Sequence, residues 1–99
     1  MPNKEIFADY LKHNHPGPEN AIKSKDLKPL FGTGEQIRAM VNALRCEGVP
    51  ICSGPDGYYY ARTREDVENT MAILYSRAFN IALACEGLAE SLGSLPKGG

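Results

Sequence analysis

The side chains best suited to nucleophilic or metal chemistry in this 99-residue chain are three cysteines and two histidines. Cys46, Cys52 and Cys85 have no CxxC spacing, and an odd number of cysteines is untypical of a disulfide framework. A zinc site would have to recruit His13 or His15 from a distant segment, against the usual ligand spacings. The sequence gives neither histidine a reason to approach a cysteine as a catalytic base. We therefore expect no metal, no cofactor and no enzymatic activity, and we interpret the cysteines as small apolar thiols.

Charged side chains are segregated along the chain, although the formal net charge is only −1. Residues 23–45 form a basic segment that carries only Asp26 and Glu35 as acids. Its basic residues are Lys23, Lys25, Lys28, Arg38 and Arg45. The acids of the second half gather in residues 65–90. Such a basic segment is typical of a surface that attracts nucleic-acid phosphates.

The length of the chain fits one domain with one modest core. No apolar run approaches the roughly 20 residues of a membrane span. The start, MPNKEIFADYLKHN, is unlike a signal peptide. We expect a cytoplasmic protein without a membrane partner, and no small-molecule ligand is evident.

Three helices are predicted before residue 48. The first follows an N-cap at Asn3 and buries one stripe, formed by Ile6, Phe7, Tyr10 and Leu11. The dipeptide at 21–22 can form a very short strand. A second helix begins with Ser24 as N-cap and ends at Gly32, and its buried residues are Leu27, Leu30 and Phe31. The third helix, about 34–47, begins with a capping box between Thr33 and Gln36 and buries Ile37, Met40, Val41 and Leu44.

A hairpin over 49–62 is predicted around the turn GPDG at 54–57. If Gly54 pairs with Tyr58, then Ile51, Tyr59 and Ala61 share a face that packs inward. Tyr58 and Tyr60 are then the more exposed pair, and they serve either in strand packing or in contacting a ligand.

One long helix is predicted over 63–92, followed by a flexible tail over 93–99. It begins with a second capping box at Thr63 and carries apolar residues at coiled-coil spacing. These are Val67, Met71, Leu74, Ala78, Ile81, Cys85, Leu88 and Leu92. The part from Val67 to Leu74 can pack on the core with Tyr10 and Leu11. The part beyond has no intramolecular partner, so we expect a homodimer with a seam of Leu74, Ala78, Ile81, Cys85, Leu88 and Leu92.

The order of these elements predicts a mainly α fold with a small β-hairpin: a winged helix-turn-helix domain over 1–62 and a long C-terminal helix. Residues 21–62 also resemble the small winged-helix proteins of phages and prophages. They are similar, more distantly, to the N-terminal domain of biotin-repressor-type regulators. The resemblance rests on SKDL at 24–27, the glycine-containing turn, IR at 37–38, NALR at 42–45, GVPI at 48–51 and DGY at 56–58.

The resemblance implies a duplex DNA-binding protein that acts in transcriptional regulation or replication control. The third helix would enter the major groove, and the hairpin would touch the backbone or minor groove. The implied base contacts are Glu35, Gln36, Arg38, Ala39 and Asn42, with Arg38 suited to guanine and Gln36 or Asn42 to adenine. The implied backbone contacts are Lys23, Ser24, Lys25, Thr33 and Arg45. The implied wing contacts are Ser53, Asp56, Tyr58 and Tyr60.

Other interpretations of the same residues stay open. Gln36 can be only a capping residue, and Arg38 and Arg45 can be only solvated charges. Ala39 departs from the polar or basic residue expected there, and Glu35 would repel phosphate unless it accepts from a cytosine amine. These two residues favour an alternative function, a winged-helix adaptor that binds protein without specific DNA binding.

Overall fold

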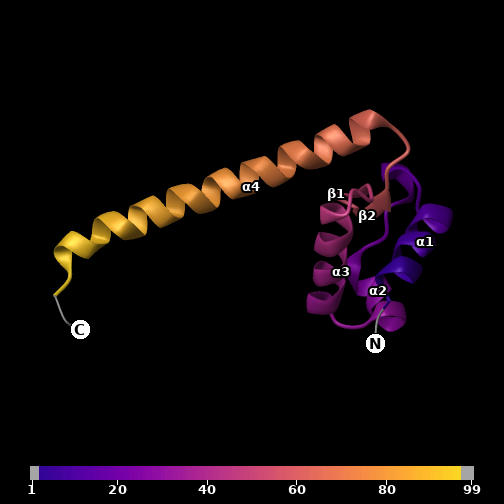
Figure 1. The fold of residues 1–99 in the computed structure, drawn as a ribbon, viewed down its shortest axis with the longest axis horizontal. Helices are drawn as coiled ribbons and strands as arrows, with labels where there is room; N and C mark the ends of the chain where they lie inside the picture. The colour runs from indigo at the N-terminus through magenta and orange to yellow at the C-terminus, as the bar shows by residue number, and fades with distance from the viewer. Residues whose placement is uncertain (1–2, 97–99) are drawn as a thin grey trace.

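The structure is a computed structural model that describes residues 3–96 and shows a small helical domain with one long projecting helix (Figure 1). Its helices are α1 (Lys4–Asn14), α2 (Ser24–Phe31), α3 (Gly34–Cys46) and α4 (Arg64–Ser91). Its strands, β1 (Ile51–Gly54) and β2 (Gly57–Tyr60), form an antiparallel hairpin. Two 3₁₀ turns lie at Pro18–Asn20 and Leu92–Ser94. The predicted fold class, mainly helical with one small hairpin and a long C-terminal helix, is confirmed.

Most helix starts follow from local side-chain chemistry. The Asn3 side chain accepts hydrogen bonds from the backbone of α1, and α3 and α4 each begin with a complete capping box. The predicted N-cap of α2 is wrong, because the helix includes Ser24 and the capping position is held by Lys23 without a side-chain bond. The backbone of Ile22 exchanges two hydrogen bonds of 2.8 Å with Tyr58. This bridge holds the chain extended up to Lys23, and the helix begins at Ser24, one residue earlier than an N-cap at Ser24 predicts.

The core lies between α1, α2, α3 and β1. Its fully enclosed side chains include Phe7, Leu11, Leu27, Ile37, Leu44 and Ile51. Two predicted core residues are wrong, because Ile6 is 60% exposed and Leu30 is 58% exposed. The Phe31 ring packs edge-on against Phe7 at 5.1 Å and against Tyr10 at 5.4 Å. The neighbours of these aromatic residues in each short helix therefore point to solvent.

The hairpin has a different register from the predicted one. Gly54 pairs with Gly57 and Cys52 with Tyr59, so the loop contains only Pro55 and Asp56. Gly57 has a φ of 121°, and a Cβ at this position would lie 2.2 Å from the carbonyl oxygen of Ile22. Only glycine can accept both conditions, and it therefore closes the turn in a paired position. A shift of one residue exchanges the two faces of a strand, so the expected common face of Ile51 and Tyr59 is wrong.

Both faces of the hairpin are covered. Ile51 belongs to the helical core, against which Tyr58 and Tyr60 pack half-buried. Cys52 and Tyr59 point the other way, beneath the first turns of α4, and are only 1% and 4% exposed. A two-stranded hairpin is marginal by itself in water, and here two layers of helix support it.

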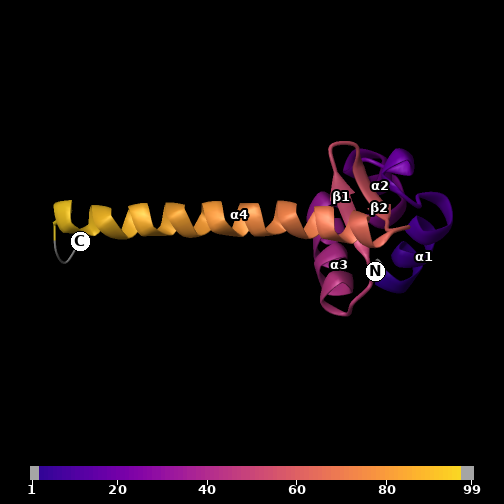
Figure 2. The ribbon, with the colours of Figure 1, turned by 90° about the horizontal axis from the view of Figure 1, so that it is seen from above.

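Helix α4 crosses the hairpin and then leaves the domain (Figures 1 and 2). It packs mainly against β1, rather than against the predicted partners on α1. All residues from Tyr75 to 96 are exposed. Within residues 3–96, no helix is long and apolar enough to cross a membrane. The first residues of the predicted tail belong to a 3₁₀ turn at Leu92–Ser94, and its last residues, 97–99, lie outside the described range.

Candidate functional site

The outer face of α3 presents all five predicted base contacts. One stripe of α3 is buried in the core, and this turns the opposite stripe outward. The exposed residues of that stripe are Glu35, Gln36, Arg38, Ala39 and Asn42. The turn between α2 and α3 lies at the end of the domain away from α4, so the projecting helix does not cover it (Figure 1).

Gln36 has a defined local role. Its Oε1 accepts a hydrogen bond of 2.8 Å from the Thr33 backbone N–H, and Thr33 Oγ1 accepts one of 3.1 Å from the Gln36 N–H. The capping interpretation of Gln36 is therefore confirmed. The bond uses the amide oxygen, so the amide NH₂ is the group that Gln36 can still offer to a ligand.

Arg38 and Lys28 lie together at the first turn of α3. A Cβ at Gly34 would lie 3.4 Å from both Lys28 Cε and Arg38 Nη1, so the two long side chains flank this glycine. They add two cations to the positive end of the α3 dipole. Sequence reasoning left Lys28 out of the site, although it counted Lys28 in the basic segment. Only the packing of α2 against α3 brings the two residues together.

Lys23 and Lys25 lie in a different place, beside the tip of the hairpin. They line an open polar hollow together with Asp26, Asp56 and Glu19. Both lysines are exposed, whereas Ser24 between them is half-buried. The predicted backbone contacts at the start of α2 and the wing residue Asp56 therefore form one surface, but its charge is mixed.

Arg45 and Ser53 are used inside the domain. Arg45 Nε donates a hydrogen bond of 2.8 Å to the Ile51 carbonyl, and its Nη2 donates one of 3.2 Å to Ser53 Oγ. Arg45 is half-buried, and this desolvation lowers its pKa, although a guanidinium stays charged at any ordinary pH. The structure thus places a predicted phosphate contact and a predicted wing contact at the junction of α3 and β1.

The tyrosines of β2 are packed to different degrees. Tyr59 is buried as predicted, whereas Tyr58 and Tyr60 are half-buried against the core. The backbone of Tyr60 also bonds to His15 and Gly17 at 2.8 Å. Strand packing accounts for most of their surface, and Asp56 is the most exposed of the predicted wing residues.

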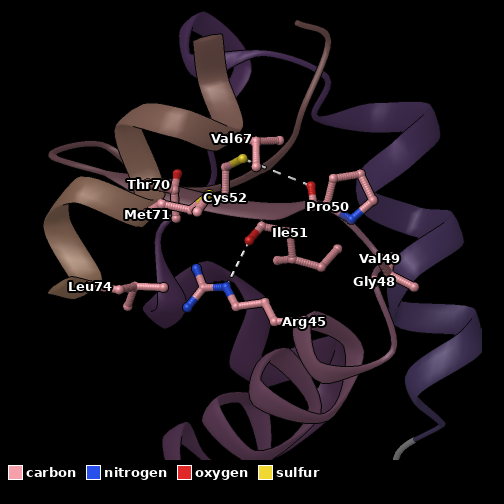
Figure 3. A pocket seen from close by; sticks show the side chains of 10 residues that line it. All are labelled: Arg45, Gly48, Val49, Pro50, Ile51, Cys52, Val67, Thr70, Met71 and Leu74. Carbon is pink, nitrogen blue, oxygen red and sulfur yellow. Dashed lines mark hydrogen bonds between the residues drawn. The ribbon is translucent and has the colours of Figure 1, made fainter. Parts of the chain in front are cut away.

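A cavity that sequence reasoning missed lies between the hairpin and α4 (Figure 3). It measures about 260 Å³, and its apolar lining includes Val49, Ile51, Val67, Met71 and Leu74, with Arg45 at its side. The cavity is smaller than the ~300–1,000 Å³ that is usual for a small-molecule site. The apolar stripe of α4 was the sequence signal that could have indicated this cavity, since Met71 and Leu74 belong to the stripe and also line the cavity.

The predicted dimer seam is partly buried at its first residue and exposed to solvent along the rest of its length. Leu74 is half-buried at the cavity, and Ala78 and the rest of the seam are exposed. Ile81, Leu88 and Leu92 are 66–69% exposed. A second apolar ridge on α4 consists of Tyr75, Phe79 and Leu83, which are also exposed.

Metal-ligating side chains do not gather in the part of the chain that the structure describes: no group of three or more His, Cys, Asp or Glu residues could hold an ion there. Cys46 and Cys85 are exposed free thiols, and Cys52 is buried. No protein-family profile, curated protein or solved structure matches this chain.

Proposed function

We propose that this protein binds duplex DNA through the outer face of α3. The observation that carries the proposal is that two cations, Lys28 and Arg38, lie close together beside Gly34 at the start of α3. The exposed amide side chains of Gln36 and Asn42 lie on the same face. Cations beside amide side chains on one exposed helix face are what major-groove recognition uses.

The arrangement of elements supports a winged helix-turn-helix domain. α2 packs against α3 across a short turn, and the hairpin follows α3 directly. The segment between α1 and α2 forms an isolated antiparallel bridge to β2 through Ile22 and Tyr58, beside the hairpin. In this proposal α3 enters the major groove, and the hairpin tip approaches the backbone or the minor groove.

Each exposed residue has a specific role in the proposal. Arg38 pairs with guanine, and Asn42 pairs with adenine. The free amide NH₂ of Gln36 can donate a further hydrogen bond to the same adenine. Glu35 accepts from a cytosine amine. Lys23, Lys25 and Lys28 neutralise phosphates, and the Thr33 hydroxyl donates a hydrogen bond to one. Arg45 contributes by holding the hairpin on α3.

The proposed complex contains two copies of the chain, joined through α4. A dimer presents two α3 helices to half-sites related by a two-fold axis. Together with the resemblance to phage and prophage proteins, this arrangement fits transcriptional regulation or replication control.

A second candidate function is a protein adaptor. Glu35 and Ala39 lie on the exposed face of α3, and acids line the hollow beside Lys23 and Lys25. These features reduce the positive potential that a DNA-binding surface needs. DNA binding is preferred because two cations, Lys28 and Arg38, stand against the single acid Glu35 at the start of α3.

Two matched pairs of variants test the DNA proposal. Arg38→Ala should cost about 1–3 kcal/mol on a selected site and relax specificity, whereas Arg64→Ala, which removes the same charge from α4, should change affinity little. Lys25→Ala should weaken binding to every sequence, and Lys12→Ala on α1 is its control. If all four variants lose affinity equally, the role assigned to the α3 face is wrong.

A further inference from the structure

The apolar stripe of α4 consists of two series of residues that differ in size. One series repeats every seven residues and is large throughout: Val67, Leu74, Ile81 and Leu88. The other also repeats every seven residues and is small in its middle: Met71, Ala78, Cys85 and Leu92. The two series lie side by side on one face of the helix, as in a coiled-coil seam.

The orientation of a second copy decides which residues meet. In a parallel pair in register, each seam residue meets its own counterpart. The middle of the seam would then contain an Ala78 layer and a Cys85 layer, each too small to fill the space between helices that are held apart by Ile81 and Leu88. In an antiparallel pair, a large residue of one copy meets a small residue of the other.

We infer that a second copy of this chain docks on α4 in the antiparallel orientation, with Ile81 of each copy against Cys85 of the other. The inference rests on the dimer of the proposed function and specifies its geometry. In the same register Ala78 meets Leu88 of the second copy, and Leu74 meets Leu92. Each layer in the middle of the seam then contains one large and one small side chain, and the helices can approach evenly along their length.

The cavity beneath α4 gives a second, independent reason for this register. Met71 and Leu74 line that cavity (Figure 3). They also line an open groove that continues along α4 to Ala78. In the antiparallel pair, Leu92 of the second copy lies over Leu74. Leu92 is 69% exposed in the single chain. The same contact therefore covers two exposed apolar surfaces: the groove where α4 leaves the domain of one copy, and the C-terminal end of α4 in the other copy.

The flanks of the stripe also fit a close helix pair. The positions beside the seam in its second half are Ala82, Ala84 and Ala89, which allow close approach. Arg77 is the sole charged residue in 69–85, so this part of α4 offers a charged partner surface only one group for an ion pair. A self-complementary apolar stripe is what a two-fold symmetric contact requires.

This geometry separates the two domains. Leu74 of one copy lies opposite Leu92 of the other, so the two Leu74 residues are 18 positions apart along the pair, or about 27 Å at about 1.5 Å per residue. The α3 helices consequently lie at opposite ends of the paired arms, and they would contact DNA at separated half-sites.

Disulfide trapping tests the orientation in the full chain without DNA. All variants carry Cys46→Ser, and Cys52 remains because it is buried. The first variant keeps Cys85, the second carries Ile81→Cys with Cys85→Ser, and the third carries Ile81→Cys with Cys85 intact. After mild oxidation, non-reducing gels should show a covalent dimer for the third variant only. Sedimentation of the reduced proteins should show that all three are dimers.

The other outcomes overturn the inference in distinguishable ways. Covalent dimers of the first and second variants would indicate a parallel pair. A dimer in sedimentation without any cross-link would show that a different register or surface joins the copies, and a monomer would show that α4 has another partner. DNA binding, measured separately on the same proteins, decides the proposed function whatever the orientation is.

Discussion

Arg45 Nε lies 2.8 Å from the carbonyl oxygen of Ile51 and ties the last turn of α3 to the first residue of β1. The same guanidinium reaches Ser53 Oγ, so one side chain spans two positions of the strand. The chain between α3 and β1 is only 47–50, and the bond fixes where the hairpin stands relative to the outer face of α3. In the proposed complex this contact sets the distance between the two DNA-facing elements.

Replacing Arg45 should lower stability more than it changes charge-dependent binding. We expect Arg45→Ala and Arg45→Lys each to reduce the free energy of unfolding by about 1–3 kcal/mol, because alanine removes the charged donor of the Ile51 carbonyl and a lysine ammonium does not reproduce the fork that bonds Ile51 and Ser53 together. Urea unfolding measures this. If Arg45→Lys is as stable as the parent while Arg45→Ala weakens only DNA binding, Arg45 is a phosphate contact as first predicted from the sequence.

Gly57 should be the least replaceable glycine of the hairpin. Gly57→Ala places a Cβ 2.2 Å from the Ile22 oxygen at a φ of 121°, and we expect it to cost at least about 2 kcal/mol. Gly87→Ala is the control, since a Cβ there meets nothing within 4 Å and replaces glycine inside a helix. It should raise helix stability by about 0.5–1 kcal/mol. Thermal unfolding of both variants checks this, and equal stability of the two would contradict the close approach of the hairpin turn to Ile22.

Stability should fall at alkaline pH because of the two residues beneath α4. Burial raises the pKa of the Cys52 thiol above its usual 9.0 and that of the Tyr59 phenol above its usual 10.0. The folded protein then keeps protons that the unfolded chain has already lost. The stabilisation is present in full below about pH 9 and is lost as the pH rises through the folded-state values.

Denaturant unfolding between about pH 8 and pH 10.5 measures this loss. Cys52→Ala lowers the starting stability by leaving a cavity, so the slope against pH is the quantity to compare. The slope of the variant should be shallower than that of the parent. An identical slope would mean that burial under α4 does not raise the pKa of the Cys52 thiol above its value in the unfolded chain.

The local features of this fold could be predicted from the sequence, but the contacts between distant elements could not. The capping boxes at Thr33 and Thr63 involve residues three apart, so the sequence contains all of their chemistry. The hairpin register depends on Ile22, which lies 35 positions before Gly57, and no local pattern indicates that contact. The exposure of Ile6 and Leu30 likewise depends on how the Phe31 ring fills the core.

The candidate site shows the same limit. The outward face of α3 follows directly from its helical period, and those predicted residues are exposed together. The partnership of Lys28 with Arg38 and the internal use of Arg45 both depend on tertiary packing. Charge counted along the chain cannot distinguish a cation that faces solvent from one that holds a strand.

The measurement that tests the central claim most directly is the affinity of the chain for labelled random-sequence duplex DNA, by anisotropy, at about 50 and 200 mM salt. Each neutralised phosphate contributes about −0.9 to the slope of log affinity against log salt. With Lys23, Lys25 and Lys28 neutralising phosphates, we expect micromolar binding at low salt and a slope of about −3 or steeper. No binding at about 50 mM salt would contradict the account and would favour a protein partner for the α3 face.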